Sequence, residues 1–502
     1  MTALQDLVSG GTLDAAHRPF PRPVVTVDAW RLAADALGRG ELTLLGLWGD
    51  RSAVHMALRD EGEIAVLSLD CPDGRFPSVG ALHPPAIRLE RTIHDLYGLE
   101  PVGAPDTRPW LDHGRWGVSQ PLGAARPGAE PLPPYAFLPA EGESLHQIPV
   151  GPVHAGIIEP GHFRFTANGE AVVRLEERLG YVHRGVEGLM AGAPLDRGAK
   201  LAGRVSGDST VAYAIAFARA AEAALGAEMP SRALWLRALM AELERLANHL
   251  GDIGAICNDA AFAMMLAHCG VLRERVLRAA DTAFGHRLMR DCVVPGGVAA
   301  DIGPAGLEAI RALVAELRRR FPPVVLLYDN TASLLDRTVG TGFVSPALVR
   351  KFGAGGYVGR ASGRRFDARK APGYPPYDAL KFEVPVREDG DVNARVWIRI
   401  REMEQSLSLV EQILAGLPGG PVRTEVPPAE GPSSGMALVE GFRGDILVWM
   451  RLDGDGRVER CHLRDPSWFQ WPLLEAAIDG NIVADFPLCN KSFNCSYAGC
   501  DL

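Results

Sequence analysis

The sequence predicts an α+β protein, in which a small N-terminal α+β domain precedes a large domain that is mainly a helical bundle with strand-rich additions. Two observations support this fold class. In the first part of the chain, short apolar segments are separated by turn residues, which is typical of strands in one sheet. Further along, long segments repeat apolar residues at helical spacing. The 502 residues are enough for more than one domain.

The small domain is predicted to cover residues 1–110. Val25–Leu37 is a predicted helix because its apolar residues, Trp30 and Leu37 among them, recur on one side. Three short apolar segments follow as predicted strands: Glu41–Leu47, Ala53–Leu58 and Glu63–Leu69. Ile87–Tyr97 is predicted to form a second helix.

Proline and glycine accumulate after this domain, which predicts a linker or an extended arm at residues 111–147. The large domain is predicted to cover residues 148–502, and it begins with the strand-like segments Val150–Ile158 and His162–Ala167. Its predicted helices are Thr210–Leu225, Leu236–Leu250, Phe262–Phe284, Leu307–Arg320 and Ile398–Leu414, and Ile446–Leu452 is a late strand. The bundle is thus expected to carry strands at both of its ends.

Composition and charge exclude some functions. The formal net charge of -9 argues against a nucleic-acid-binding protein. The longest apolar stretches fall short of the ~20 residues that a membrane helix needs, so any membrane association is expected to come through partner subunits. Residues 1–23 lack the pattern of a secretory signal. The eight cysteines are too scattered for the framework of a small secreted protein, which favours a reducing cytoplasm.

Several motifs, taken in order, resemble those of one family. The motifs are Leu89–Gly98, Gly151–His162, Leu179–Glu187, Glu244–His249, Phe284–Val298, Ala361–Gly363 and Gly390–Arg395. The chain resembles the large subunit of membrane-bound group 4 [NiFe]-hydrogenases, of the hydrogenase-4 or formate hydrogenlyase kind, and the fused C–D subunit of complex I. The resemblance implies a [NiFe]-hydrogenase large-subunit-like fold, with residues 1–110 similar to the 30-kDa and residues 148–502 similar to the 49-kDa subunit of complex I.

The metal ligands of this family are replaced in the chain. The family holds a nickel–iron centre with two Cys-x-x-Cys pairs, and Ser206 and Ser209 stand where the first pair would be. A serine hydroxyl is a hard ligand with a high pKa and does not replace a bridging thiolate, so we expect no nickel. Near the end of the chain, Cys489 and Cys495 are weak metal candidates, because their spacing is not that of a standard site. Free thiols in a folded tail are the favoured alternative.

The resemblance implies a cavity where the metal was, lined by the loop of His154, the turn from Ser206 to Ser209 and the C-terminal tail. His154 matches a histidine that, in complex I, donates to a quinone headgroup, and an imidazole can also relay a proton. The alternative is a loop histidine that bonds backbone carbonyls. Gly207 aligns with a tyrosine of complex I, so a quinone site built as in complex I would lack that phenol.

Three further residues receive roles from the resemblance. Glu159 matches a carboxylate that resembles the proton gate of hydrogenases, and Asp208 is a second candidate for proton transfer. Arg184 is expected near a partner's iron–sulfur cluster or the cavity, with a structural ion pair as the alternative. The basic run Arg360–Lys370 predicts a solvated face that docks a neighbour, and the Glu244–His249 segment predicts polar contacts within or between subunits.

Together these motifs predict a subunit of a membrane-associated oxidoreductase complex, related to NADH:quinone oxidoreductase and energy-converting hydrogenase, that takes part in electron transfer coupled to proton movement without a nickel–iron centre. A quinone is a possible ligand, and a [4Fe–4S] cluster is expected on a partner small subunit. Antiporter-like and other membrane subunits are the remaining expected partners, at the cytoplasmic face of the membrane. The alternatives are an active [NiFe] hydrogenase with unusual ligands and a non-catalytic scaffold subunit.

Overall fold

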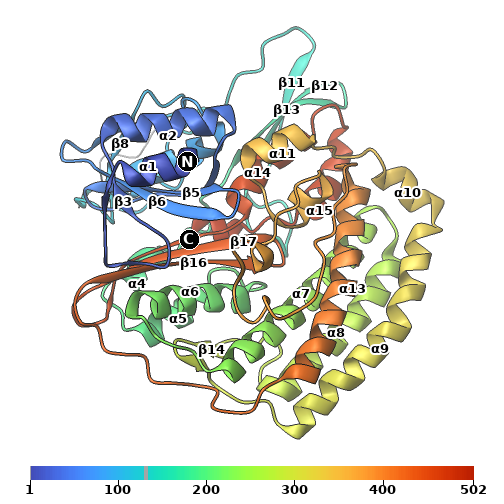
Figure 1. Cartoon of the computed structure of the whole chain (residues 1–502). Helices are drawn as coiled ribbons and strands as arrows, with labels where there is room; N and C mark the ends of the chain where they lie inside the picture. Colours follow the sequence, from blue (N-terminus) through green and yellow to red (C-terminus); the bar gives the residue numbers. More distant parts are fainter. Residues whose placement is uncertain (1, 129–133) are drawn as a thin grey trace.

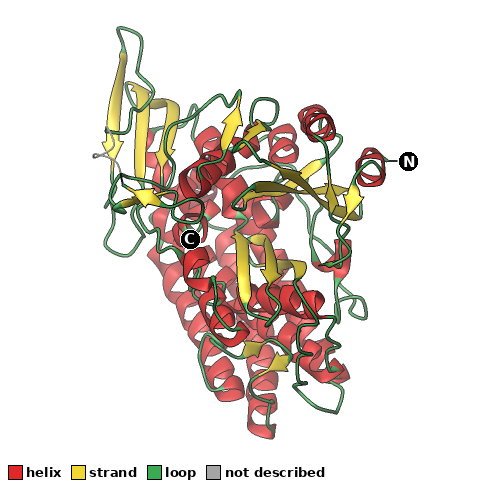
Figure 2. Ribbon diagram, turned by 90° about the vertical axis from the view of Figure 1, so that its left-hand side faces the viewer, coloured by secondary structure: helices red, strands yellow, loops and turns green. Residues whose placement is uncertain are grey.

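The computed structural model describes residues 2–128 and 134–502. Residues 129–133, which belong to the predicted linker, lie outside the described residues. Most of the helices lie in the lower part of the molecule, and most of the strands lie in its upper half and centre (Figure 2). This arrangement confirms the α+β class. None of the described helices combines the length and the apolar character that a bilayer crossing requires.

The N-terminal domain is built around a five-stranded sheet with the order β1-β3-β6-β5-β4. Its strands are β1 (Thr12–Leu13), β3 (Pro23–Val24), β4 (Thr43–Gly49), β5 (Ala53–Asp60) and β6 (Glu63–Asp70). Its helices are α1 (Ala3–Ser9), α2 (Val27–Arg39), η1 (Pro84–Ala86) and α3 (Ile87–Tyr97). Thr26 caps the start of α2 and Gly40, with a φ of 75°, ends it. The predicted helices and strands of this domain are confirmed, with small shifts at their ends.

Five long helices form the bundle of the large domain (Figure 1). They are α6 (Thr210–Leu225), α7 (Ser231–Asp259), α8 (Ala263–Phe284), α9 (Pro304–Asp329) and α13 (Val392–Gly416). Helix α7 is buried along most of its length, because α8 and α13 both pack on it. The prediction that ended a helix at Arg320 was too short, since α9 continues through Pro322 and Pro323. The predicted helix Leu236–Leu250 was also too short, since α7 spans Ser231–Asp259, and the remaining predicted helices are confirmed.

Shorter helices connect the bundle to the rest of the fold. They are α4 (Val186–Met190), α5 (Leu195–Ala202), α10 (Ala332–Thr338), α11 (Pro346–Phe352), α12 (Gly356–Ala361), η2 (Arg369–Gly373), α14 (Ser467–Ala477), η3 (Val483–Asp485), α15 (Phe486–Phe493) and α16 (Tyr497–Asp501). The last of these, α16, lies at the end of the chain and is buried. The C-terminal residues are therefore part of the interior.

A second sheet joins the two ends of the chain. Its order is β18-β17-β16-β2, with strands β2 (His17–Arg18), β16 (Ser433–Gly441), β17 (Gly444–Leu452) and β18 (Val458–Arg464). Strand β2 comes from the N-terminal residues and pairs parallel with β16. The rings of Trp48 on β4 and Trp449 on β17 lie 5.6 Å apart. The small domain thus packs directly on the C-terminal sheet.

A three-stranded antiparallel sheet precedes the bundle, with β11 (Leu145–Val150), β12 (His162–Asn168) and β13 (Ala171–Arg178). The predicted strand Val150–Ile158 is wrong, because the chain leaves the sheet at Val150 and residues 151–161 form an irregular loop. Gly151 has a φ of 88°, and Pro152 has no N–H to donate, so the ladder cannot continue. Three two-stranded ribbons complete the strands: β7 (Arg75–Pro77) with β8 (Glu100–Val102), β9 (Val118–Ser119) with β10 (Arg126–Pro127), and β14 (Val293–Val294) with β15 (Gly297–Val298).

Candidate functional site

The buried C-terminal tail gathers the residues that the sequence singled out. Helix α15 ends at Phe493 and is capped by Asn494, which has a φ of 45°. The Ser496 hydroxyl then accepts from the N–H of Gly499 at the start of α16. Asp501 and Cys500 have no exposed surface. Because the tail is enclosed, its polar groups find their hydrogen-bond partners in the protein segments around it.

The turn before α6 meets this tail through two hydroxyl groups. The Ser206 hydroxyl lies 2.9 Å from that of Ser496, and it also donates to a carboxylate oxygen of Asp208 at 2.9 Å. Ser209 follows as the last residue before α6. The turn and the tail therefore adjoin, and the groups that meet there are hydroxyls.

Arg443, at the turn between β16 and β17, forms an ion pair with Asp208. Its Nη1 donates to Asp208 Oδ1 at 2.7 Å, and Nη2 lies 2.5 Å from Oδ2. Burial would raise the pKa of Asp208, but the guanidinium of Arg443 outweighs this effect and lowers the pKa. Asp208 is thus an ionised carboxylate whose charge is already compensated. The sequence offered no sign of this pairing, because 235 residues separate the two.

The loop of residues 151–161 reaches the tail with an imidazole and a carboxylate. His154 Nε2 lies 3.5 Å from the phenol oxygen of Tyr497, and Glu159 Oε2 accepts from the N–H of Ala498 at 3.0 Å. Burial lowers the pKa of His154, so its imidazole is neutral at neutral pH. A Cβ at Gly207 would meet nothing within 4 Å. Tyr497 places a phenol beside His154.

Arg184 also contacts both the turn and the tail. Its guanidinium donates to the carbonyls of Arg204 and Val205 at 3.0 and 2.7 Å, and its backbone N–H donates to the carbonyl of Leu502 at 2.7 Å. The guanidinium of Arg184 therefore bonds backbone carbonyls, and the structural ion pair that was the alternative prediction is not observed. The guanidinium fixes the turn that carries Ser206 next to the end of the chain.

Two buried carboxyl groups near the turn and tail have raised pKa values. Asp501 accepts from the N–H groups of Gly180 and Val182, yet burial raises its pKa to about 7. Glu244 on α7 accepts from the first N–H groups of α6, and burial raises its pKa to about 8. Glu244 shares a cavity of about 300 Å³ with Asp208. Both groups can therefore hold a proton near neutral pH.

Neither the turn nor the tail cysteines offer a soft-metal site. Around Ser206 the donors are hydroxyls and a carboxylate that Arg443 already pairs, and such hard donors do not fit a nickel–iron centre. Cys489 and Cys495 are buried, and burial raises the pKa of Cys489 to about 12 and also raises that of Cys495. In residues 2–128 and 134–502, no group of three or more histidine, cysteine or acidic side chains could hold a metal ion.

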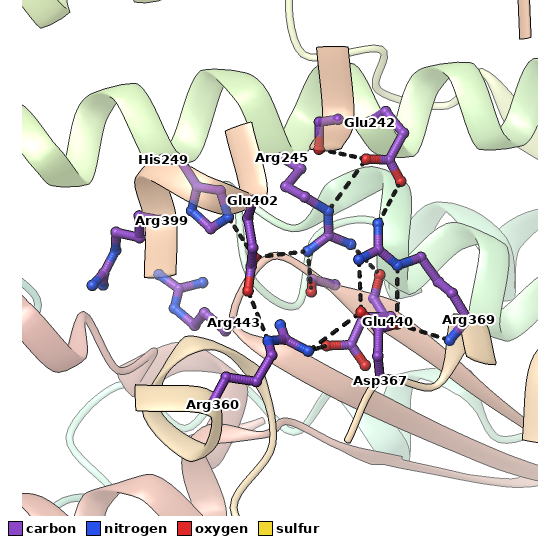
Figure 3. A network of polar contacts seen from close by, with 12 residues as sticks. Glu242, Arg245, His249, Arg360, Asp367, Arg369, Arg399, Glu402, Glu440 and Arg443 are labelled. Carbon is purple, nitrogen blue, oxygen red and sulfur yellow. Dashed lines mark hydrogen bonds and ion pairs between the residues drawn. The ribbon is translucent and has the colours of Figure 1, made fainter. Parts of the chain in front are cut away.

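A buried ionic network lies in the bundle next to this region (Figure 3). Glu402 on α13 accepts from Arg360 at 2.7 Å and lies 2.8 Å from a ring nitrogen of His249. Arg369 contacts both Asp367 and Glu242. The prediction of a solvated face at Arg360–Lys370 is wrong for Arg360 and Arg369, which are buried and bind carboxylates of α7, α13 and β16. Arg365 and Lys370 are exposed, and docking of a neighbour there stays a prediction. The polar contacts predicted for Glu244–His249 are confirmed as contacts within the chain.

Comparisons with known proteins find the same group of relatives over most of the chain. Residues 259–438 and 426–502 match the model of the respiratory-chain NADH dehydrogenase 49 kDa subunit, and residues 42–131 match that of the 30 kDa subunit. Formate hydrogenlyase subunit 5 of Escherichia coli is 30% identical, over 87% of this chain and 78% of the relative. Hydrogenase-4 component G of the same organism is 32% identical, over 92% and 82%.

Two further matches extend this relation. One of the subunits of the NADH-quinone oxidoreductase of Syntrophobacter fumaroxidans is 32% identical, over 70% of this chain and 95% of the relative. Among solved structures, a chain of the membrane-bound sulfane sulfur reductase, an archaeal respiratory membrane complex, superposes with a TM-score of 0.68 and 28% identity. That superposition covers 72% of this chain and 99% of the other.

Proposed function

This chain belongs to the family that joins the complex I 49 kDa subunit with the large subunits of membrane-bound hydrogenases, and from this premise we propose that it handles protons in a respiratory oxidoreductase complex without a nickel–iron centre. Members of this family are subunits of membrane-associated oxidoreductase complexes, and this chain is therefore such a subunit. We assign proton transfer to the region where the turn at Ser206, the loop of His154 and the C-terminal tail meet, which is where the resemblance places a metal.

One observation carries the proposal: the turn at Ser206 meets the tail at Ser496 through hydroxyls, with the ion pair of Asp208 and Arg443 beside them. This arrangement leaves no thiolate to grip a soft metal. Proton carriers surround it instead. Asp501 and Glu244 have pKa values near neutrality, and the imidazole of His154 lies beside the phenol of Tyr497.

A quinone is the second candidate for this site, as an electron acceptor. The observation that favours it is the 3.5 Å approach of His154 Nε2 to the Tyr497 hydroxyl. A phenol donates a hydrogen bond to a carbonyl oxygen, and a neutral imidazole offers either a donor or an acceptor. When bound, a quinone would supply the two-electron chemistry, and the residues of this chain would orient it and hold the proton.

We further propose that the chain binds an iron–sulfur small subunit with a [4Fe–4S] cluster and stands on antiporter-like membrane subunits at the cytoplasmic face. The membership of relatives in membrane-bound complexes supports this assembly. The loop of His154 supports it too, because Val153 and Ile157 expose 80% and 95% of their surface on it. Apolar side chains that lie so far from the core are suited to cover by a partner.

The test uses the complex purified through a tag on this chain. Elemental analysis should give far less than one nickel per chain, and a stoichiometric nickel content would overturn the proposal. In the same complex, His154→Ala should lower turnover with any donor–acceptor pair that the native complex uses. The matched control is His146→Ala on strand β11, where the histidine is exposed. Equal turnover of both variants would identify the chain as a scaffold.

A further inference from the structure

A cavity of about 420 Å³ lies between the small domain and the large domain. The small domain contributes Arg59 on β5, and the large domain contributes residues 365–367, 370–371 and 382–384. These wall residues do not include the turn at Ser206, the loop of His154 or the C-terminal tail, so the cavity is separate from the region that we assign to proton transfer. Its volume falls within the roughly 300–1,000 Å³ of pockets that bind small molecules.

Three basic side chains line this cavity: Arg59, Arg365 and Lys370. Arg59 is half-buried, whereas Arg365 and Lys370 are exposed. The ion pairs of the run Arg360–Lys370 are formed by Arg360 and Arg369. In the part of the chain that the structure describes, no carboxylate pairs with Arg59, Arg365 or Lys370, and all three are therefore available to an anion.

The acidic side chains of the wall do not balance these cations. Asp367 is already bound, because Arg369 donates to its Oδ2 at 2.6 Å and Arg360 lies 3.3 Å from the same oxygen (Figure 3). Glu383 is the other acidic residue of the wall and is exposed. The wall thus presents three cations against one carboxylate that is not bound to another arginine, and it carries a net positive charge.

Two guanidinium groups contact the ring of Phe366, which belongs to the wall. The Cζ atoms of Arg59 and Arg364 lie 4.6 and 4.5 Å from the centre of this ring. Burial lowers the pKa of both groups, to about 10 for Arg364, and the nearby charge of Asp445 does not offset it. Asp445 is itself paired with Arg464. Because a desolvated cation without a bonded anion is unfavourable, these groups point to an anion from outside the chain.

Aromatic and aliphatic side chains complete the wall. The Nζ atom of Lys370 lies 3.9 Å from the centre of the ring of Phe382, which places the ammonium group by a cation–π contact. Val384 adds aliphatic surface beside this ring. Arginine binds phosphate oxygens with two parallel N–H bonds, and lysine binds them as a compact charge. The wall therefore combines groups that bind phosphate with a surface that can contact carbon.

We propose that this cavity binds the phosphate group of a small organic phosphate. Arg59 and Arg365 donate to the phosphate oxygens, Lys370 supplies a third positive charge, and the carbon part contacts Phe382. A phosphate monoester carries about two negative charges near pH 7.5, which matches three cations opposed by the single free carboxylate of Glu383. Such monoesters come from two sources, as free phosphorylated molecules and as headgroups of anionic lipids.

The burial of Arg59 argues for a compact ligand. An acidic segment of a partner subunit would reach the exposed Arg365 and Lys370 but not a half-buried arginine in a recess between two domains. A phosphate group is small enough to contact all three. The variant of Arg59 therefore distinguishes a ligand inside the cavity from a protein that lies across its mouth.

The test is isothermal titration of the full-length chain at pH 7.5 with three probes: glycerol 3-phosphate, dihexanoyl phosphatidate below its micelle concentration, and hexaglutamate. We expect at least one phosphate probe to bind with one-to-one stoichiometry and hexaglutamate to bind at least about tenfold more weakly. The stronger of the two phosphate probes identifies the source. The proposal is overturned if neither phosphate probe binds. It is also overturned if hexaglutamate binds equally well, which would identify a docking surface for an acidic partner.

Two variants place the binding in this cavity. Arg59→Gln should weaken the preferred phosphate probe by about 10–100-fold, whereas Arg51→Gln, at an exposed arginine outside the wall, should not. Lys370→Gln should weaken it by about 2–5-fold, with the exposed Lys351→Gln as its control. Circular dichroism checks that each variant folds, and Lys370→Gln alone decides if Arg59→Gln does not. Wild-type affinity in the folded variants would refute the site.

Discussion

The hydroxyl of Ser206 lies 2.9 Å from the hydroxyl of Ser496, although 290 residues separate them in the chain. This contact joins the turn before α6 to the C-terminal tail, the two segments where the resemblance places metal ligands. Asp208 and Arg443 extend it into an ion pair, and Tyr497 extends it to His154. Substitutions at these groups, and in the adjoining ionic network, can separate their chemical roles from their structural ones.

Restoring the first cysteine pair should not restore nickel. In the double variant Ser206→Cys and Ser209→Cys, the tail would still present the hydroxyl of Ser496, and Asp208 would still be paired with Arg443. Two thiolates do not complete the four-thiolate set that the resemblance implies for a nickel–iron centre. Elemental analysis of the purified complex should find nickel well below one per chain, as in the wild type. Full occupancy in the double variant would contradict this view of the pocket.

The hydroxyl of Tyr497 should matter for turnover. If Tyr497 and His154 pass or hold a proton together, Tyr497→Phe should lower the turnover of the assembled complex by about 10–100-fold and change its pH profile. The ring remains in the variant, so the packing against Trp471 is kept. Tyr181→Phe serves as the control, because Tyr181 is partly exposed. An unchanged pH profile for Tyr497→Phe would argue for a structural role.

The ionic network in the bundle should be costly to break. Glu402 is buried and faces Arg360 and His249, so Glu402→Gln leaves a guanidinium with less compensating charge in the interior. We expect the free energy of unfolding to fall by about 3 kcal/mol, measured by chemical denaturation. Glu411→Gln on the same helix breaks an exposed pair with Arg318 and should cost only about 0–1 kcal/mol. Similar losses in the two variants would contradict the burial argument.

Stability should decrease with rising pH because of Glu244. Its pKa is about 8 in the folded protein, against an ordinary value of 4.5. Between these values the folded protein holds a proton that the unfolded chain has released, so the free energy of unfolding falls as pH rises, by at most about 1.4 kcal/mol per pH unit. Denaturation curves from pH 5 to pH 8 should show a shallower decline for Glu244→Gln.

The exposed Glu228 provides the comparison for this pH experiment. Glu228→Gln should leave the wild-type slope unchanged. If Glu244→Gln instead follows the wild-type curve across the whole range, the carboxyl of Glu244 does not retain its proton in the folded state.

Local sequence was a good guide to the regular elements. Ile87–Tyr97 and Thr210–Leu225 have the predicted bounds, because apolar spacing and the glycines that follow each helix act over short distances. The prediction of a strand through Val150–Ile158 failed because Gly151 and Pro152 break the hydrogen-bond ladder. The domain boundaries and the linker at residues 111–147 stay predictions.

The buried charges show where local sequence is a poor guide. The run Arg360–Lys370 looks solvated, because a row of basic residues usually faces water. Its partners Glu402 and Glu440 come from distant segments and compensate the charge of Arg360 inside the bundle. Burial of an arginine depends on these counter-charges, and their position is a property of the folded chain.

The sequence by itself determined the fold class, the family and the presence of hydroxyls at positions 206 and 209, because each follows from residue identity and spacing along the chain. Only the tertiary structure decided that Ser496 meets Ser206, that Arg443 neutralises Asp208 and that Tyr497 stands beside His154. The physical reason is that hydrogen bonds and ion pairs act over a few ångströms, while the segments that make these contacts are brought together by the packing of the whole core.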